Sequence, residues 1–160
     1  MDDPRWLVDE MLGRLARYLR FLGYDTEYAH GASDDDLVRQ AREEQRRLIT
    51  RDQQLATRTP GAILLTRVDI AGQMSELRAA FPLLRMEVRF DRCSRCNGRL
   101  ELRPSVPQGA LDQALPPEVR EGKTALYACS RCGHLYWEGS HTRSVRASLA
   151  AWSISRPEHG

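Results

Sequence analysis

The sequence predicts a mixed α/β fold, in which a mostly parallel sheet is flanked by helices and followed by a small cysteine-containing module. Two observations support this prediction. Short apolar runs alternate with helical patterns over about the first ninety residues, and this rhythm is typical of parallel sheets with helices on both faces. Two Cys-x-x-Cys pairs follow, as CSRC at 93–96 and again at 129–132. A chain of 160 residues can bury one core together with such a module.

The first predicted elements are a strand, a long helix and a second strand. RWLV (5–8) is a short apolar run typical of a strand, and YDTEYA (24–29) is expected to form the next one. Between them, EMLGRLARYLRFLG (10–23) has a helical pattern. At about 100° per residue its apolar side chains gather on one face, which comprises Leu12, Leu15, Ala16, Leu19 and Leu22.

Two further helices are predicted around a third strand. DDDLVRQAREEQ (34–45) has a helical pattern, and either Ser33 or Asp34 would open it as the N-terminal cap. RLIT (47–50) is expected to form a strand, and DQQLAT (52–57) a short helix. The β-α-β-α order is thereby maintained.

The last part of the predicted core contains a strand at AILLTRV (62–68), a helix at IAGQMSELRAAF (70–81) and a final strand at LRMEVRF (84–90). A boundary falls near residue 91, where the cysteine module begins. The expected units are a core over 1–90, a ribbon-like module with a loop-rich insertion over 91–142, and a C-terminal tail over 143–160 that forms a short helix packing on the core.

The cysteine spacing indicates a metal site. Two Cys-x-x-Cys pairs in a cytosolic protein are typical of tetrahedral zinc, and four thiolates fill the coordination shell, so the ion would be structural rather than catalytic. Disulfides, a redox pair or an iron–sulfur cluster are the alternatives. The 32 residues between the pairs contain four prolines, which favours a loop-rich excursion between short strands. The expected zinc ligands are Cys93, Cys96, Cys129 and Cys132.

The composition is that of a soluble globular protein, with 41% hydrophobic and 29% charged residues. No apolar run approaches the roughly 18 residues of a membrane span, and MDDPRWLVDE lacks the apolar segment of a signal peptide. We therefore expect a cytoplasmic protein without membrane association. The net charge of +2 does not by itself indicate a nucleic-acid binder. The charge is distributed unevenly along the chain. Residues 1–90 carry 14 Arg and 15 acidic residues, whereas residues 91–160 carry 10 basic and 7 acidic residues, so the second part is the more basic.

Arginines share the face of the long helix opposite its apolar residues. Arg14, Arg17 and Arg20 lie there, with Tyr18 beside them. They form either an ordinary solvated face or a stripe that contacts RNA phosphates with an aromatic ring nearby. Arg51, in LITRD, would either support a phosphate site or simply finish its strand.

Aspartates follow three of the predicted strands. Asp9, Asp52 and Asp69 stand at these positions, and Asp34 begins the second helix. The carboxyl ends of parallel strands meet at one edge, where open α/β folds bind ligands. Carboxylates that converge there repel one another unless a cation binds, and their oxygens suit Mg²⁺ or Mn²⁺, ions that support phosphodiester hydrolysis. The alternative is that each aspartate caps a helix.

Four blocks of sequence extend over most of the chain: DEMLGRLARYLRFLGYDTEY, SDDDL, LITRD, and the paired CxxC with CGHLYWEGSH. From about Leu7 to His141 they resemble the PIN-fold ribonuclease domains that carry a C-terminal zinc ribbon, a family named after the C-terminal domain of the mut-seven exoribonuclease. The resemblance implies a PIN-like, Rossmann-like core and metal-dependent cleavage of RNA, by either endo- or exonucleolytic attack.

The resemblance also implies roles for the acids. Asp9, Asp34 and Asp52 match the acidic residues that hold Mg²⁺ or Mn²⁺, and Asp69 is a looser match for a fourth catalytic acid. The register of the second acid is not fixed by the motif, so alternatives stay open. These alternatives are Asp35, Asp36, Glu43 and Glu44.

Two functions are consistent with these residues. The first is a ribonuclease with structural zinc and a catalytic Mg²⁺ or Mn²⁺ site. The second is a non-catalytic adaptor that binds RNA or protein. In the block GHLYWEGSHTR (133–143), Tyr136, Trp137 and His141 with Arg143 would stack bases and hold a phosphate, or the two aromatic residues would pack the ribbon on the core.

Overall fold

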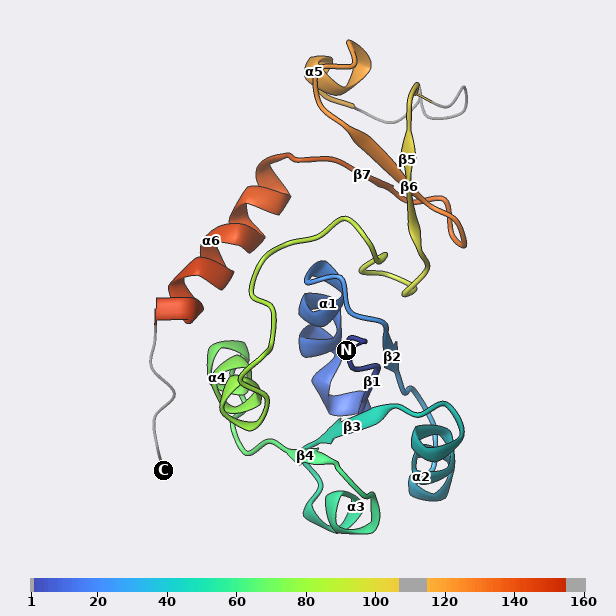
Figure 1. The fold of residues 1–160 in the computed structure, drawn as a ribbon, viewed down its shortest axis with the longest axis vertical. Helices are drawn as coiled ribbons and strands as arrows, with labels where there is room; N and C mark the ends of the chain where they lie inside the picture. The colour runs from blue at the N-terminus through green and yellow to red at the C-terminus, as the bar shows by residue number, and fades with distance from the viewer. Residues whose placement is uncertain (1, 107–114, 155–160) are drawn as a thin grey trace.

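The computed structural model describes residues 2–106 and 115–154, and its main layer is a four-stranded parallel sheet (Figure 1). The strands lie in the order β2-β1-β3-β4, so the first strand of the chain is central. Val8 lies opposite Tyr28 on one side and Ile49 on the other. The predicted parallel sheet is confirmed. Its strands are β1 (Trp6–Val8), β2 (Thr26–Tyr28), β3 (Arg47–Thr50) and β4 (Ile63–Leu64).

Helices cover both faces of the sheet. Successive side chains of a strand point to opposite faces, and here apolar side chains on both faces are buried under helices. Trp6 and Val8 pack with α1 and α4 in the larger core, whereas Leu7 packs with α2 and α3 on the other face. The helix predicted from residue 10 begins with a 3-10 turn. The elements are η1 (Glu10–Leu12), α1 (Gly13–Phe21), α2 (Asp34–Glu43), α3 (Gln53–Arg58) and α4 (Ile70–Ala80).

The helices begin where polar side chains satisfy the free N–H groups of a first turn. Ser33, rather than Asp34, caps α2 and forms a capping box with Asp36. Asp9, Asp52 and Asp69 cap η1, α3 and α4, and each accepts hydrogen bonds from N–H groups of the following turn. The capping role considered for these three aspartates is therefore confirmed.

The final strand predicted over 84–90 is wrong. Leu84 and Val88 are buried, but the segment forms no strand. Its backbone hydrogen bonds go elsewhere: the Arg89 N–H donates to the Phe21 carbonyl at 2.9 Å, and the Arg85 N–H donates to the Tyr24 hydroxyl at 2.8 Å. The segment therefore packs as irregular chain on the end of α1.

A second, antiparallel sheet forms the ribbon, with strand order β5-β6-β7. It surrounds a small apolar cluster of its own, which includes Leu126, Leu135 and Val119. In its described part the connection between the cysteine pairs contains a short helix between two strands, and 107–114 lie outside the described residues. The ribbon elements are β5 (Leu100–Arg103), α5 (Pro117–Arg120), β6 (Leu126–Cys129) and β7 (Leu135–Tyr136).

The last helix, α6 (Ser140–Ile154), returns from the ribbon to the main sheet and lies beside α4 (Figure 1). It begins three residues before the tail predicted from residue 143. Val145 and Leu149 of α6 join the larger core. Residues 155–160 of the tail lie outside the described residues. None of the helices in the described parts is both long and apolar enough to cross a membrane.

Candidate active site and metal centre

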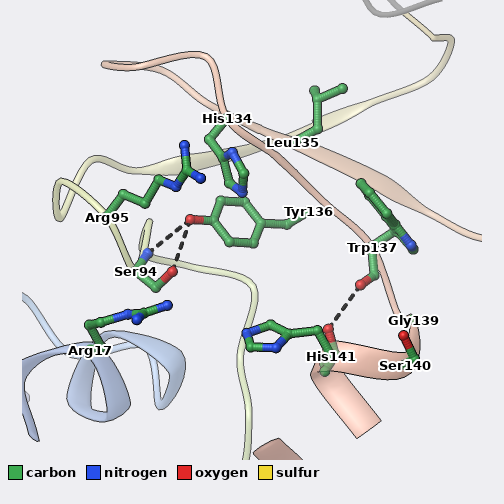
Figure 2. Close-up of a pocket in the computed structure, with 11 residues that line it drawn as sticks. Arg17, Ser94, Arg95, His134, Leu135, Tyr136, Trp137, Gly139, Ser140 and His141 are labelled. Atoms are coloured by element: carbon green, nitrogen blue, oxygen red, sulfur yellow. Dashed lines mark hydrogen bonds between the residues drawn. The ribbon is translucent and has the colours of Figure 1, made fainter. Parts of the chain in front are cut away.

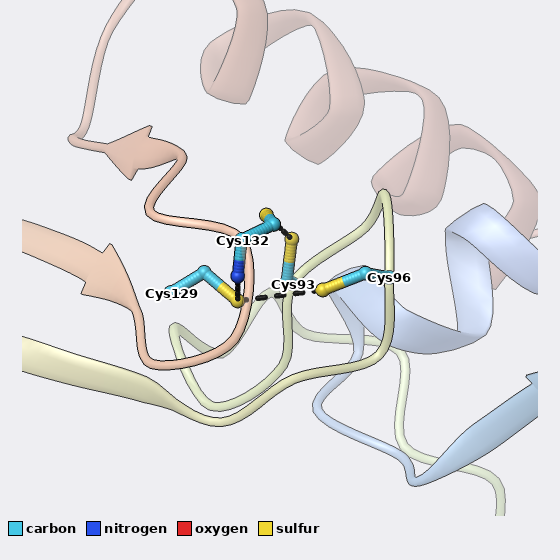
Figure 3. Close-up of side chains that lie close together, drawn as sticks. All are labelled: Cys93, Cys96, Cys129 and Cys132. Atoms are coloured by element: carbon cyan, nitrogen blue, oxygen red, sulfur yellow. Dashed lines mark hydrogen bonds between the residues drawn. The ribbon is translucent and has the colours of Figure 1, made fainter.

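Four cysteine thiols converge at the base of the ribbon (Figure 3). The Sγ atoms of Cys93 and Cys132 lie 3.7 Å apart, those of Cys96 and Cys129 lie 3.4 Å apart, and all four lie within 4.8 Å of one another. All four are free thiols. Among residues 2–106 and 115–154, no other group of three or more His, Cys, Asp or Glu ligand atoms gathers this closely. The cluster suits a tetrahedral zinc ion, with neither histidine of the ribbon in the group.

Both Cys-x-x-Cys pairs adopt the same tight turn. The Asn97 N–H donates to the Cys93 carbonyl at 2.9 Å, and the Gly133 N–H donates to the Cys129 carbonyl at 3.0 Å. Asn97 and Gly133 both have left-handed backbones, with φ of 69° and 77°. A Cβ at Gly98 would lie only 2.6 Å from the Cys129 sulfur, so this position requires glycine.

The surroundings of the thiols favour charge at one of them. Burial opposes ionisation of Cys129, but N–H groups of Cys132 and Arg131, each 3.4 Å from its sulfur, outweigh it and lower the pKa to about 7. Burial raises the pKa of Cys96 to about 12. Because zinc binds thiolates, metal binding here is coupled to the release of protons.

The first cysteine turn docks on the edge strand β2. Asn97 is only 1% exposed, and its Oδ1 accepts a hydrogen bond from the Thr26 N–H at 2.9 Å. Its Nδ2 donates to Asp25 at 2.8 Å and to Glu27 at 3.2 Å. These bonds occupy an N–H group on the otherwise open side of the strand. The metal site is therefore joined directly to the parallel sheet.

Arg20 strengthens the same junction and does not match its predicted place in an exposed stripe. It is 6% exposed, and its guanidinium donates to the Thr26 carbonyl at 2.9 Å and to the Ser94 carbonyl at 3.2 Å. Arg14 and Arg17 are exposed, as expected. The ribbon covers the part of α1 that holds Arg20. Arg20 is therefore not available to bind a phosphate.

At the carboxyl edge of the main sheet, Thr50 links two of the predicted acids. Asp9 and Asp52 follow the adjacent strands β1 and β3. The fully buried Thr50 hydroxyl donates to Asp9 Oδ2 at 2.7 Å and accepts from the Asp52 N–H at 3.0 Å. Asp52 Oδ1 accepts from the N–H groups of α3, and this fixes its orientation. Thr50 thus holds the Asp9 carboxylate and the backbone of Asp52 at one edge of the sheet.

The three aspartates that open α2 differ in their partners. Asp35 pairs with Arg58 of α3, and Asp36 is engaged in the capping box and with Arg39 at 2.6 Å. Asp34 is exposed, and within the described residues it has neither an ion pair nor a hydrogen bond to its carboxylate. Of the three, Asp34 is therefore the one whose oxygens remain available.

The other acids considered lie apart or are engaged. Asp69 stands five residues beyond the end of β4, and the hydrogen bond from the Gly72 N–H lowers the pKa of its carboxyl. Glu44 pairs with Arg46 before β3, at the opposite edge of the sheet. Glu43 lies nine residues after Asp34 on α2, a rise of about 13 Å. Within the described residues, no acidic trio is as compact as the cysteine cluster.

A family model for the Mut7-C RNase domain matches residues 4–149, which include both sheets, the carboxyl edge and all four cysteines. The chain belongs to this family. Comparison with curated proteins and with solved structures gave no match. The resemblance inferred from the motifs is thus confirmed, and the family's name indicates a ribonuclease-related role.

Two residues of this Mut7-C domain at the carboxyl edge escaped the sequence analysis. The exposed side chains of Glu10 and His30 lie 3.1 Å apart, Oε1 to Nδ1, beside Asp9. The Tyr28 hydroxyl donates to the Glu10 carbonyl and holds this turn against β2. His30 lies two residues beyond the end of β2. This position after a strand is the sequence feature that could have indicated a place at the carboxyl edge.

Arg51 lies between Thr50 and Asp52 in the Mut7-C domain. Its Nε is buried and has no hydrogen-bond partner among the described residues. A buried N–H of this kind is costly unless it is paired. The phosphate-binding role considered for Arg51 stays a prediction.

The aromatic residues of the ribbon are partly used in packing. The Tyr136 hydroxyl contacts the Cys93 sulfur and Ser94 at 3.1 Å, and Trp137 packs on the small apolar cluster of the ribbon. His141 lies against Phe21 of α1, with ring centroids 5.8 Å apart. Tyr136 and Trp137 are thus engaged within the ribbon, and His141 joins the start of α6 to α1. All three residues also line a pocket.

Proposed function

We propose that the chain is a metal-dependent ribonuclease that hydrolyses RNA phosphodiester bonds at the carboxyl edge of its PIN-like core. The observation that carries this proposal is the Thr50 hydroxyl, which joins Asp9 and Asp52 across adjacent strands. The hydroxyl fixes the Asp9 carboxylate, and N–H groups of α3 fix that of Asp52, so two carboxylates are ordered at adjacent strand ends, where a cation would offset their repulsion. Membership of an RNase family supports the same function.

The donor set fits a hard divalent cation. Asp9, Asp34 and Asp52 would hold Mg²⁺ or Mn²⁺, since each offers carboxylate oxygens with unused acceptor capacity. When bound, such an ion lowers the pKa of a water molecule and neutralises charge on a phosphate. The chain itself orients Asp9 through Thr50 and Asp52 through α3, and Arg51, between Thr50 and Asp52, would contact a phosphate.

Asp→Asn variants separate ligands from caps, because Asn caps helices about as well as Asp but lacks the charge. We expect Asp9→Asn, Asp34→Asn and Asp52→Asn to lose cleavage of a mixed RNA pool in Mn²⁺ while remaining folded. Asp36→Asn is the matched control, since Asp36 is engaged with Arg39 and the capping box and should retain cleavage. Full activity of both Asp9→Asn and Asp52→Asn would exclude the site.

An adaptor without catalytic activity is the second candidate. It is favoured by one observation: capping already accounts for Asp9, Asp52 and Asp69. In that case the wild-type protein would bind RNA or protein, would not cleave RNA in Mg²⁺ or Mn²⁺, and would tolerate all three Asn substitutions.

A further inference from the structure

A pocket of about 290 Å³ opens where α1 meets the ribbon (Figure 2). Arg17 reaches it from α1 and Arg95 from the first cysteine turn, and the rings of His134, Tyr136 and His141 line its other walls. The volume is at the lower end of the range for small-molecule sites, so it suits a single nucleotide rather than a folded RNA.

The pocket is positively charged and its charges are unpaired. None of the residues that line it is acidic. In the described parts of the chain, Arg17 and Arg95 form no ion pair and no side-chain hydrogen bond, whereas Arg46, Arg58 and Arg146 each pair with a carboxylate. Two unpaired guanidinium groups that line the same pocket favour binding of an anion, and a guanidinium matches the geometry of phosphate.

A groove of about 460 Å³ continues this pocket toward the carboxyl edge. It shares Arg17, Ser94 and Arg95 with the first pocket and ends at Gly13 and Tyr28. The Tyr28 hydroxyl donates to the carbonyl of Glu10, the residue after Asp9. Gly13 and Arg17 are one turn apart, a rise of about 6 Å on α1, which is close to the span of one nucleotide.

We infer that the pocket between α1 and the ribbon binds one nucleotide of a single-stranded RNA. The phosphate lies between Arg17 and Arg95, and the base stacks on the ring of His134, Tyr136 or His141. The strand then follows the groove past Gly13 to the carboxyl edge. This inference rests on the proposed function, and it makes the zinc ribbon the part of the molecule that holds the substrate.

The test is binding of a fluorescent single-stranded 12-nucleotide RNA to the zinc-loaded chain without added Mg²⁺ or Mn²⁺. Arg17→Ala and Arg95→Ala should each weaken binding about 10-fold and reduce the slope against salt by about one. Arg42→Ala, an exposed residue of α2 on the other face of the sheet, should stay within about twofold of wild type. In cleavage assays the pocket variants should raise KM and leave kcat unchanged.

Binding and cleavage give separable outcomes. If both pocket variants bind RNA like wild type while Asp9→Asn abolishes cleavage, the pocket inference fails and the ribonuclease proposal stands. If wild type never cleaves but binding depends on Arg17 and Arg95, the ribonuclease proposal fails and the pocket stands. Equal affinity for a duplex of the same sequence would overturn the stacking of single-stranded bases. Circular dichroism and zinc content of each variant establish that it is folded.

Discussion

The side-chain oxygen of Asn97 lies 2.9 Å from the backbone nitrogen of Thr26, so a residue of the first cysteine turn occupies the open edge of the parallel sheet. Arg20 binds the carbonyls of Thr26 and Ser94 on the same junction. The ribbon is therefore docked on β2 by buried polar bonds, and this docking also sets Arg95 over α1. The metal centre and the proposed RNA groove depend on one contact region.

Asn97→Ala should lower the free energy of unfolding by about 2 kcal/mol, because Asp25 and the Thr26 N–H lose a buried partner. Asn also tolerates the left-handed backbone better than Ala does. Asn97→Gly removes that strain while still deleting the side-chain bonds. Chemical denaturation should show a comparable loss for Gly; a glycine variant as stable as wild type would show that backbone conformation alone matters.

Zinc removal should unfold the ribbon and loosen its contact with β2. We expect one zinc per chain by elemental analysis, and Cys129→Ser should reduce this content and lower Tm, since structural zinc supplies about 10 kcal/mol or more in small fingers. Ser130→Ala, an exposed change in the same turn, should do neither. A zinc-free protein with its four cysteines in disulfides would contradict this assignment.

Stability should fall in acid because of Asp25. Burial disfavours its charge, but hydrogen bonds from Arg46 and Asn97 outweigh burial and lower the pKa to about 2. Since the folded pKa is below the unfolded value near 4, this stabilisation is present above about pH 4 and is lost as the pH falls toward 2. Asp25→Asn should lose about 2 kcal/mol at pH 7 and much less at pH 2.

Urea titrations at both pH values measure this difference. Asp2→Asn serves as the control, because Asp2 is exposed near the amino terminus. The same loss for Asp25→Asn at pH 7 and pH 2 would mean that the charge of Asp25 contributes nothing.

Local patterns in the sequence predicted the helices and strands of the main sheet, but they could not show which surfaces become covered. The apolar residues of 84–90 correctly indicated a partly buried segment, in which Leu84 and Val88 are buried. They could not show that this segment bonds to Phe21 and Tyr24 instead of a strand. The spacing of apolar residues in the sequence indicates which side chains are buried. Strand pairing depends instead on a partner segment that is distant in the sequence.

The candidate site shows the same limit of local patterns. Cysteine spacing was sufficient for the metal cluster, because four thiols in two close pairs have few other uses. The helical pattern of α1 placed Arg20 with Arg14 and Arg17, yet the ribbon buries it. Thr50 connects Asp9 and Asp52 only after β1 and β3 pair, so its role depends on tertiary structure.

Arginines on α1 should therefore divide into two classes. Arg20→Ala should cost about 2–3 kcal/mol of stability, since it deletes buried charge-assisted bonds to Thr26 and Ser94. Arg14→Ala, at an exposed position, should change stability by less than about 0.5 kcal/mol and weaken RNA binding. Thermal unfolding and RNA titration of both variants test this division; a stable Arg20→Ala that binds RNA poorly would restore Arg20 to the phosphate-contacting stripe.

Thr50 should act as a positioning residue for the acidic site. Thr50→Val keeps the shape of the side chain but leaves Asp9 without its donor and the Asp52 N–H without its acceptor, so about 1–3 kcal/mol of stability should be lost. Partners that orient metal ligands typically change metal affinity about 10–100-fold. The Mn²⁺ concentration for half-maximal cleavage should therefore rise by that factor in Thr50→Val.

Thr50→Ser separates the hydroxyl from the methyl group. It should restore the Mn²⁺ requirement of wild type even if some stability is lost, because the bonds to Asp9 and Asp52 can re-form. Thr57→Val, which deletes an exposed hydroxyl of α3, should leave the Mn²⁺ requirement unchanged. A purely structural role for Thr50 would lower Tm in the Val variant without moving the Mn²⁺ midpoint, and that result would remove the support on which the ribonuclease proposal chiefly rests.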